Sequence, residues 1–132
     1  MSALTGYFRY VLMQNPAVYA EVSSRIYPKK LPIKPTIPSI TILEPNTSIE
    51  DTTDAFTRIQ FTVYGAEANG VSAFDATDSL LDKLTKALLN HTGNRNGVYV
   101  TEMHHVINTQ GLSDDELIDF AHSEWDVTWE KI

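Results

Sequence analysis

An alternating segment that runs directly into an amphipathic segment is the feature that most limits how this chain can fold. In residues 58–64, apolar side chains occupy every second position, which is the pattern of a strand with one face on a core. Gly65 ends the alternation, and a short linker with turn-forming residues follows it. From Val71 to Leu88, apolar residues recur at helical spacing, and Gly93 is placed to end the helix. A half-apolar strand followed by a half-apolar helix predicts a two-layer fold, with a helix packed on a sheet.

The segments on either side of this unit predict further helices and strands. The N-terminal segment predicts two short helices separated at Pro16, because proline is tolerated at the first position of a helix. Residues 39–44 and 98–107 are predicted strands, and the second of them has apolar side chains on both faces. Residues 120–131 alternate throughout, which predicts a closing strand with an acidic outer face.

A proline-rich segment lies in the first half of the chain. Five of the six prolines lie between Pro28 and Pro45. Proline lacks the N–H that a sheet ladder needs, so residues 27–38 are predicted to form an extended crossing segment and not a central strand. The polar residues 90–97 are predicted to form a loop. The sum is an α+β fold in one domain, residues 1–132: a mostly antiparallel sheet of about four main strands packed against one long helix, with short N-terminal helices.

The charge balance and the missing cysteines exclude several classes of function. Ten Lys and Arg stand against 17 Asp and Glu, which gives a formal net charge of −7 at pH 7. A nucleic-acid-binding surface needs clustered cations, so we do not expect specific nucleic-acid binding. Without cysteine, neither a disulfide framework nor thiolate chemistry is possible. There is no signal-peptide pattern and no apolar run of the roughly 18 residues that span a membrane, so we expect an intracellular protein.

Glu102, His104 and His105 form the most site-like cluster in the sequence. Adjacent strand residues point to opposite faces, so the two imidazoles do not readily share one metal ion. Glu102 and His104 share a face, but two ligands are too few for a metal site. An ordinary strand surface is the favoured interpretation, and no metal ligand is predicted.

The other candidates for chemistry also favour structural interpretations. Arg25 lies in a pre-proline segment and is expected to brace a turn through carbonyl groups, although an anion is the alternative ligand. Trp125 and Trp129 share one face of the closing strand and are expected in the core, although tryptophans can also stack on a base or a sugar. No phosphate-binding glycine loop, nucleophile elbow or paired-carboxylate signature is present, so we expect no enzyme and no cofactor.

The order of several short segments resembles the tail terminator, or tail completion (tail-to-head joining), proteins of long-tailed bacteriophages. The segments that carry the resemblance are Asn15-Pro16-Ala17-Val18, Arg25-Ile26-Tyr27-Pro28, Leu31-Pro32 and Pro38-Ser39-Ile40-Thr41. The strand at residues 58–64, the amphipathic helix and a closing strand with alternating tryptophans follow them, so the similarity spans nearly the whole chain.

The resemblance implies a structural virion protein that is not an enzyme. Such proteins look like small α+β subunits that form a hexameric ring, cap the growing tail tube and stop its polymerisation. The implied partners are other copies of the chain, the tail tube protein and the head-completion or connector protein, with DNA only passing through the lumen. The implied location is the virion, where the tail meets the head, after assembly in the cytoplasm of the bacterial host.

A ring with a lumen suggests a role for the acidic face of the closing strand. Glu124, Asp126 and Glu130 share this face. If it lines the lumen, it repels DNA phosphates and limits sticking during genome passage.

A second surface hypothesis concerns the acidic run Asp114-Asp115-Glu116. This run lacks the alternating ligands and the glycine of a calcium-binding loop. It lies in the loop of residues 108–119, which we expect to dock on a partner, because a mobile acidic loop can order on binding.

Other classes of protein stay open on the sequence alone. Another head–tail connector or minor tail protein would share this size and composition. A small-molecule-binding or enzymatic α+β domain would place His104 or Arg25 in a pocket. A non-viral adaptor would recognise peptides by strand addition at a sheet edge.

Overall fold

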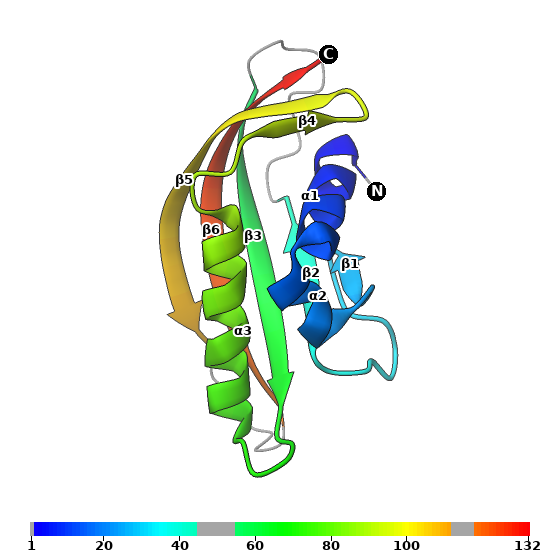
Figure 1. Cartoon of the computed structure of the whole chain (residues 1–132), viewed down its shortest axis with the longest axis vertical. Helices are drawn as coiled ribbons and strands as arrows, with labels where there is room; N and C mark the ends of the chain where they lie inside the picture. Colours follow the sequence, from blue (N-terminus) through cyan, green and yellow to red (C-terminus); the bar gives the residue numbers. More distant parts are fainter. Residues whose placement is uncertain (1, 45–54, 112–117) are drawn as a thin grey trace.

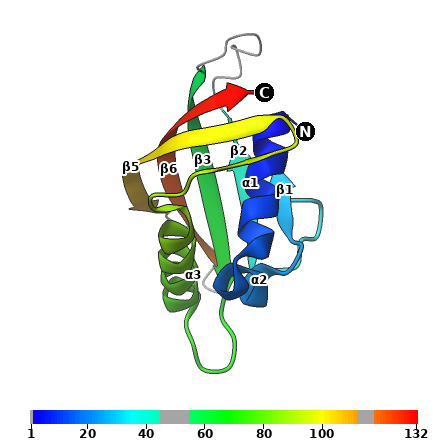
Figure 2. The same cartoon turned by 45° about the horizontal axis from the view of Figure 1, so that its top comes forward.

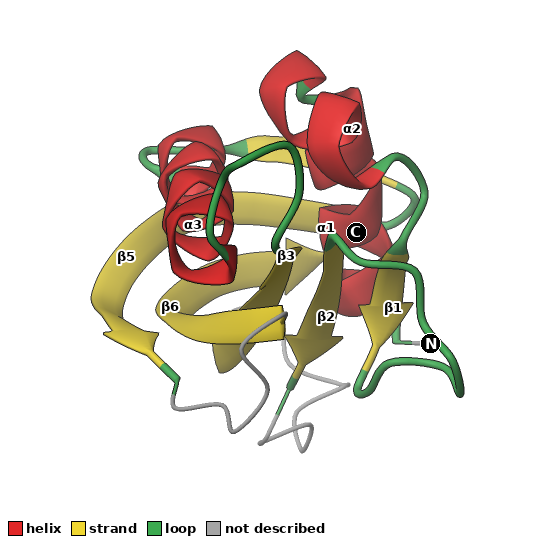
Figure 3. Cartoon of the chain, turned by 90° about the horizontal axis from the view of Figure 1, so that it is seen from below, coloured by secondary structure: helices red, strands yellow, loops and turns green. Residues whose placement is uncertain are grey.

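Six strands form one continuous sheet in the computed structural model, which describes residues 2–44, 55–111 and 118–132. The strands are β1 (Ile26–Pro28), β2 (Ser39–Leu43), β3 (Ala55–Ala66), β4 (Gly93–Arg95), β5 (Val98–Gln110) and β6 (Ile118–Lys131). Their order across the sheet is β1-β2-β3-β6-β5-β4. β1 and β2 run parallel and the other neighbours run antiparallel, so the sheet is mixed. It curls into a half-barrel, as Figure 3 shows from one end.

Three short helices lie within the curve of this sheet. They are α1 (Ala3–Gln14), α2 (Pro16–Val22) and α3 (Ala73–Leu88). α3 packs on β3 and β6, whereas α1 and α2 cover the part of the sheet around β1 and β2 (Figure 1). In the described part of the chain, no helix covers the convex face of the sheet (Figure 3). None of the described helices combines the length and the apolar character that a membrane crossing needs.

Capping side chains set where the helices begin. Ser2, Asn15 and Ser72 each precede a helix, and each side-chain oxygen accepts a hydrogen bond from the backbone N–H three residues later. Pro16 occupies the first position of α2, where its missing N–H costs nothing. Asn15 therefore ends α1 and starts α2 within one residue, which fixes the bend between the two helices.

The core fills the space between the three helices and the concave face of the sheet. On β3, Ile59, Phe61 and Val63 are fully buried, and the residues between them point to the convex face. β6 repeats this alternation, with Trp125 as the largest fully buried side chain. The helix residues that are almost fully buried include Leu4, Phe8 and Leu12 of α1, Val18 and Val22 of α2, and Leu80, Leu84 and Leu88 of α3.

Both tryptophans of β6 belong to this core and not to a stacking surface. Trp125 donates its indole N–H to Ser123 Oγ at 2.8 Å. Trp129 donates its indole N–H to Thr57 Oγ1 at 3.0 Å. Each buried indole nitrogen thus has a partner, which burial of a polar group requires.

β5 extends well beyond its outer neighbour. β4 pairs only with Val98–Val100, so among the described strands none pairs with residues 101–110 on the side away from β6. The pairing of β5 with β6 shifts register twice, between Val100 and Glu102 and between His105 and Ile107. Such shifts mark β-bulges, which bend and twist the strand.

The predicted architecture, about four mostly antiparallel strands packed against one long helix, is wrong. The structure has six strands in a mixed sheet that curls, and three short helices together cover its concave face. α3 has 16 residues and reaches only the middle of the sheet. A single helix cannot cover a sheet of this width, so α1 and α2 supply the rest of the core layer.

The two strands missing from the prediction are three residues each, which is too short for a hydrophobic period to reveal. β1 falls at the start of the segment predicted as an extended crossing, and Pro28 is its last residue at the edge of the sheet, where proline is tolerated. β4 falls in the predicted polar loop. It forms a two-residue hairpin with β5 through Asn96 and Gly97, whose φ angles are 48° and 83°. Positive φ at both positions is the signature of the type I′ turn that Asn-Gly favours.

Replacing Gly65 with Ala should destabilise the fold by about 1–3 kcal/mol, as overpacking usually does. An added Cβ at Gly65 would lie 2.4 Å from Thr77 Oγ1, 2.6 Å from Thr77 N and 2.9 Å from Thr77 Cα, so α3 has to move away from β3. Urea unfolding of Gly65→Ala measures this cost.

The double variant Gly65→Ala/Thr77→Ala serves as the control. The second substitution removes the hydroxyl of Thr77 but leaves the clash with its backbone. We therefore expect Gly65→Ala to cost the Thr77→Ala variant about as much stability as it costs the wild type. Full recovery would show that the side chain, and not the backbone, sets the closeness of α3 to β3.

Candidate functional site

The convex face of the sheet carries the three acidic residues proposed to face a lumen. Glu124, Asp126 and Glu130 lie on β6 and point away from the helices, opposite to the buried positions of the strand. The register places Glu124 between Gln60 of β3 and Ile107 of β5. The three residues therefore share a face, and their side chains are partly exposed.

An ion pair reduces the negative charge of this face. Asp126 accepts two hydrogen bonds from Arg58 of β3, Nε to Oδ1 at 2.9 Å and Nη2 to Oδ2 at 3.1 Å. The hydrogen bond to Asp126 is the main cause that raises the pKa of Arg58, and the charges of Asp126 and Glu124 add to it. A planar guanidinium gripping both carboxylate oxygens is a geometrically specific pair. Glu124 and Glu130 thus carry most of the negative charge that remains on this strand face.

His104 and His105 do not form a metal site. His104 is exposed on the convex face opposite Asp126. His105 packs against the Trp125 ring with centroids 4.6 Å apart, and its Nε2 lies 2.8 Å from Asn108 Oδ1. Among the described residues, no group of three or more metal-binding side chains converges on one point.

Arg25 braces a loop, as its place before a proline suggests. Its Nε donates to the carbonyl oxygen of Pro38 at 2.8 Å, and its Nη2 donates to that of Glu21 at 3.0 Å. The guanidinium therefore holds the end of the loop between β1 and β2. Arg25 directly precedes β1, and three strands separate β1 from the β5 position of His104, so the two residues do not line one pocket.

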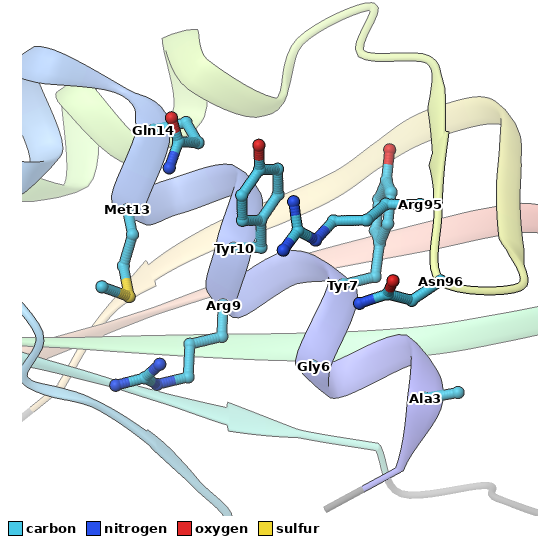
Figure 4. A pocket seen from close by; sticks show the side chains of 9 residues that line it. All are labelled: Ala3, Gly6, Tyr7, Arg9, Tyr10, Met13, Gln14, Arg95 and Asn96. Atoms are coloured by element: carbon cyan, nitrogen blue, oxygen red, sulfur yellow. The ribbon is translucent and has the colours of Figure 1, made fainter.

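A groove of about 400 Å³ lies between α1 and the turn that joins β4 to β5 (Figure 4). Figure 2 shows this hairpin crossing near the N-terminal end of α1. The Arg95 guanidinium lies over the Tyr10 ring, with Cζ 3.4 Å from the ring centroid, which is a cation–π contact. Arg9 lines the other side and donates to the carbonyl oxygens of Ile26 and Ser24.

The hydrogen bond between Tyr7 and His91 closes the inner end of this groove. Tyr7 Oη lies 2.6 Å from His91 Nε2, which ties α1 to the segment that follows α3. Burial lowers the pKa of His91 and raises the pKa of Tyr7, so both groups are neutral at neutral pH. A neutral imidazole leaves Nε2 free to accept the phenol proton. The pair is a buried structural contact between two elements.

The groove has a positive character that the analysis of the sequence did not find. Its lining residues include Arg9 and Arg95 but no carboxylate. The sequence hints at this positive charge only through α1, which contains no acidic residue. Arg95 lies 86 positions after Arg9, and the two come together because the curl of the sheet brings β4 back over α1. The arrangement can attract carboxylate groups of a partner.

The proposed docking residues Asp114, Asp115 and Glu116 lie outside the described residues. The flanking positions are described: β5 ends at Gln110 and β6 begins at Ile118.

The chain matches no model of a known protein family, and no curated protein shows significant similarity to it.

Exchanging His91 for Gln should flatten the dependence of stability on acidity. Burial holds the pKa of His91 below its ordinary value of 6.5, so the unfolded chain binds this proton more readily than the folded chain. The contribution of neutral His91 is complete above that value and is lost as the pH falls below it. We therefore expect the melting temperature of the wild type to fall more steeply than that of His91→Gln between about pH 7 and pH 5. Equal slopes would contradict the burial of His91.

Proposed function

We propose that this chain is a structural subunit of a bacteriophage tail, which assembles as a ring on the end of the tail tube. The ring stops polymerisation of the tube and joins the tail to the connector of the head. It performs no catalysis and holds no cofactor. Its place is the virion, and its partners are other copies of the chain, the tail tube protein and the connector protein.

The observation that carries the proposal is the ordered set of segments that resemble tail terminator proteins, together with the places these residues take in the fold. Asn15 and Pro16 set the bend between α1 and α2. Arg25 holds the carbonyl of Pro38, and so fixes the end of the loop between β1 and β2. The resembling residues thus maintain the scaffold, which supports a likeness of the whole domain and not of one surface motif.

Two uncovered surfaces support an assembling subunit. The convex face of the sheet has no helix over it in the described part of the chain, and partly exposed side chains of β3, β6 and β5 line it. The outer edge of β5 exposes Val106 and Ile107, which are 37% and 49% exposed. Strand edges and half-covered sheets are surfaces on which copies of a protein can associate.

Deleting the gene from a phage that carries it tests the proposal. We expect lysates with overlong tails, or with heads and tails that remain separate, when viewed by electron microscopy. Supplying the wild-type protein to the lysate should restore joined particles. Infectious particles of normal length without the protein would contradict the proposal.

The charge of the convex face gives a sharper test of the proposed lumen. Glu124→Lys should slow genome ejection while rings still form, because a lumenal cation attracts the phosphates that pass it. Glu67→Lys is the matched control, since Glu67 is exposed beyond the end of β3 and away from this face. Asp126 is left intact, because its reversal would break the pair with Arg58. If Glu124→Lys particles eject their genome at the rate of the control particles, the convex face does not line the lumen.

A further inference from the structure

A protruding loop of residues 29–38 joins β1 to β2 and presents one apolar side chain to solvent. Ile33 is 94% exposed, the highest value among the exposed large apolar residues of the described chain. Lys30 and Lys34 lie on either side of it in sequence, and both are exposed. A single exposed isoleucine is ordinary on a protein surface, but its burial against a partner would be favourable.

The loop is held in place at both ends. Lys29 N donates to the carbonyl oxygen of Ile42 at 2.8 Å at its start, and Arg25 holds the carbonyl of Pro38 at its end. Three prolines between these anchors, Pro32, Pro35 and Pro38, restrict the backbone further. A loop with so little freedom loses little entropy when a partner covers it.

A groove of about 320 Å³ lies on the other side of the molecule, between α3 and β5. Its lining residues are Asp78, Ser79, Leu81, Asp82 and Thr85 of α3 and Asn108 of β5. Leu81 lines the groove, although it belongs to the core and is only 6% exposed. Asp78 and Asp82 are exposed carboxylates one helical turn apart. The nearest cation paired with them is Lys86, whose Nζ lies 2.9 Å from Asp82 Oδ2 in an exposed pair. The groove therefore combines an apolar part with a negative rim.

Charge is also unevenly distributed along the chain: the part that contains the loop is positive, and the part that contains the groove is negative. Residues 2–44 carry five cations against two carboxylates, whereas the other described residues carry five cations against nine carboxylates. The five cations of the first group are Arg9, Arg25, Lys29, Lys30 and Lys34, and its two carboxylates are Glu21 and Glu44. One side of the chain therefore complements the other, although the whole chain carries a formal net charge of −7.

We propose that the loop of one copy docks in the groove between α3 and β5 of a second copy. Ile33 covers Leu81 of the neighbour, and Lys30 and Lys34 lie against Asp78 and Asp82 of the neighbour. The loop and the groove lie on opposite sides of the molecule in Figures 1 and 2, so each copy gives its loop to one neighbour and its groove to another. Such a head-to-tail contact closes into a ring when the rotation between copies divides a full turn. This contact rests on the ring of the proposed function and names the surfaces that build it.

The other uncovered surfaces fit the loop less well. The groove beside α1 contains Arg9 and Arg95, so it repels Lys30 and Lys34. The convex face offers Glu124 and Glu130, with the exposed Ile107 opposite Glu124 in the register, but no groove is described on it. A third groove contains Glu21 and Asp75 with apolar lining, but Pro38 at the end of the loop also lines it, so it lies beside the loop of its own copy. The groove between α3 and β5 combines two exposed carboxylates with a position opposite the loop.

Disulfide trapping tests the contact directly, because the chain has no cysteine of its own. Ile33→Cys is converted to its mixed disulfide with thionitrobenzoate and then added to Ser79→Cys, and the released thionitrobenzoate is followed by absorbance. His104→Cys, an exposed position on the convex face, is the matched acceptor. Each rate is divided by the rate of the same acceptor thiol with a small mixed disulfide of thionitrobenzoate, which removes differences in intrinsic reactivity. We expect the Ser79→Cys acceptor to react roughly tenfold faster or more, because docking raises the local concentration of the two sulfurs. Equal normalised rates would overturn the contact.

Charge reversal tests whether the lysines and aspartates face one another. Lys30→Glu/Lys34→Glu in the activated donor should abolish the preference for Ser79→Cys. Asp78→Lys/Asp82→Lys in the acceptor should restore it with this donor, and circular dichroism checks that α3 stays folded. If that acceptor unfolds, Asp78→Lys alone replaces it. If the preference of the donor for Ser79→Cys over His104→Cys stays the same in both charge-reversal experiments, the assigned ion pairs are wrong.

The contact and the proposed function can fail separately. Rings on tail tubes that show no preference between Ser79→Cys and His104→Cys would overturn the contact and leave the proposed function standing. A selective disulfide in a protein whose deletion leaves tails normal would support the contact and overturn the tail function.

Discussion

The antiparallel ladder between β3 and β6 holds the molecule together. It runs without a register shift from the pair Ala55–Trp129 to the pair Ala66–Ile118. β1 and β2 attach to one side of it, and β5 and β4 attach to the other, so it joins the first half of the chain to the last. Because side chains alternate along a strand, this one ladder sends Phe61 to the core and Arg58 to the convex face. A slip of one residue would exchange core for surface, which is why the register has to be unique.

Much of the central architecture could be predicted from the period of the apolar residues. The alternation in β3 and β6 and the stripes of α1 and α3 are local patterns, and each predicts an element that the structure contains. The bounds of α3 differ from the prediction: it begins at Ala73 and not at Val71, and Gly93, predicted to end it, begins β4. The number of strands, the parallel pair and the curl could not be predicted in this way, since they depend on which distant segments meet. The Asn96–Gly97 hairpin is different, because its turn signal is present in the sequence, although the polar residues around it favour a loop.

The candidate surfaces show the same division between local and distant information. The sequence shows that Glu124, Asp126 and Glu130 share one face of a strand. It does not show that Arg58, 68 positions earlier, neutralises Asp126 and leaves a weaker field than three carboxylates would produce. The groove beside α1 and the groove between α3 and β5 each combine residues from elements far apart in the chain. The lysines around Ile33 are evident in the sequence, but their complement on α3 becomes evident only when the two sides of the fold are seen together.

The two bulges in β5 bear on what kind of assembly this chain can make. A straight, flat strand edge would accept the same edge of any other copy through its backbone, and each addition would leave a new edge exposed. Such growth has no natural end and leads to fibres. The bulges between Val100 and Glu102 and between His105 and Ile107 interrupt the spacing of backbone donors and acceptors along that edge. In the ring proposed here, copies would therefore associate through side chains, which recognise one particular neighbour in one orientation.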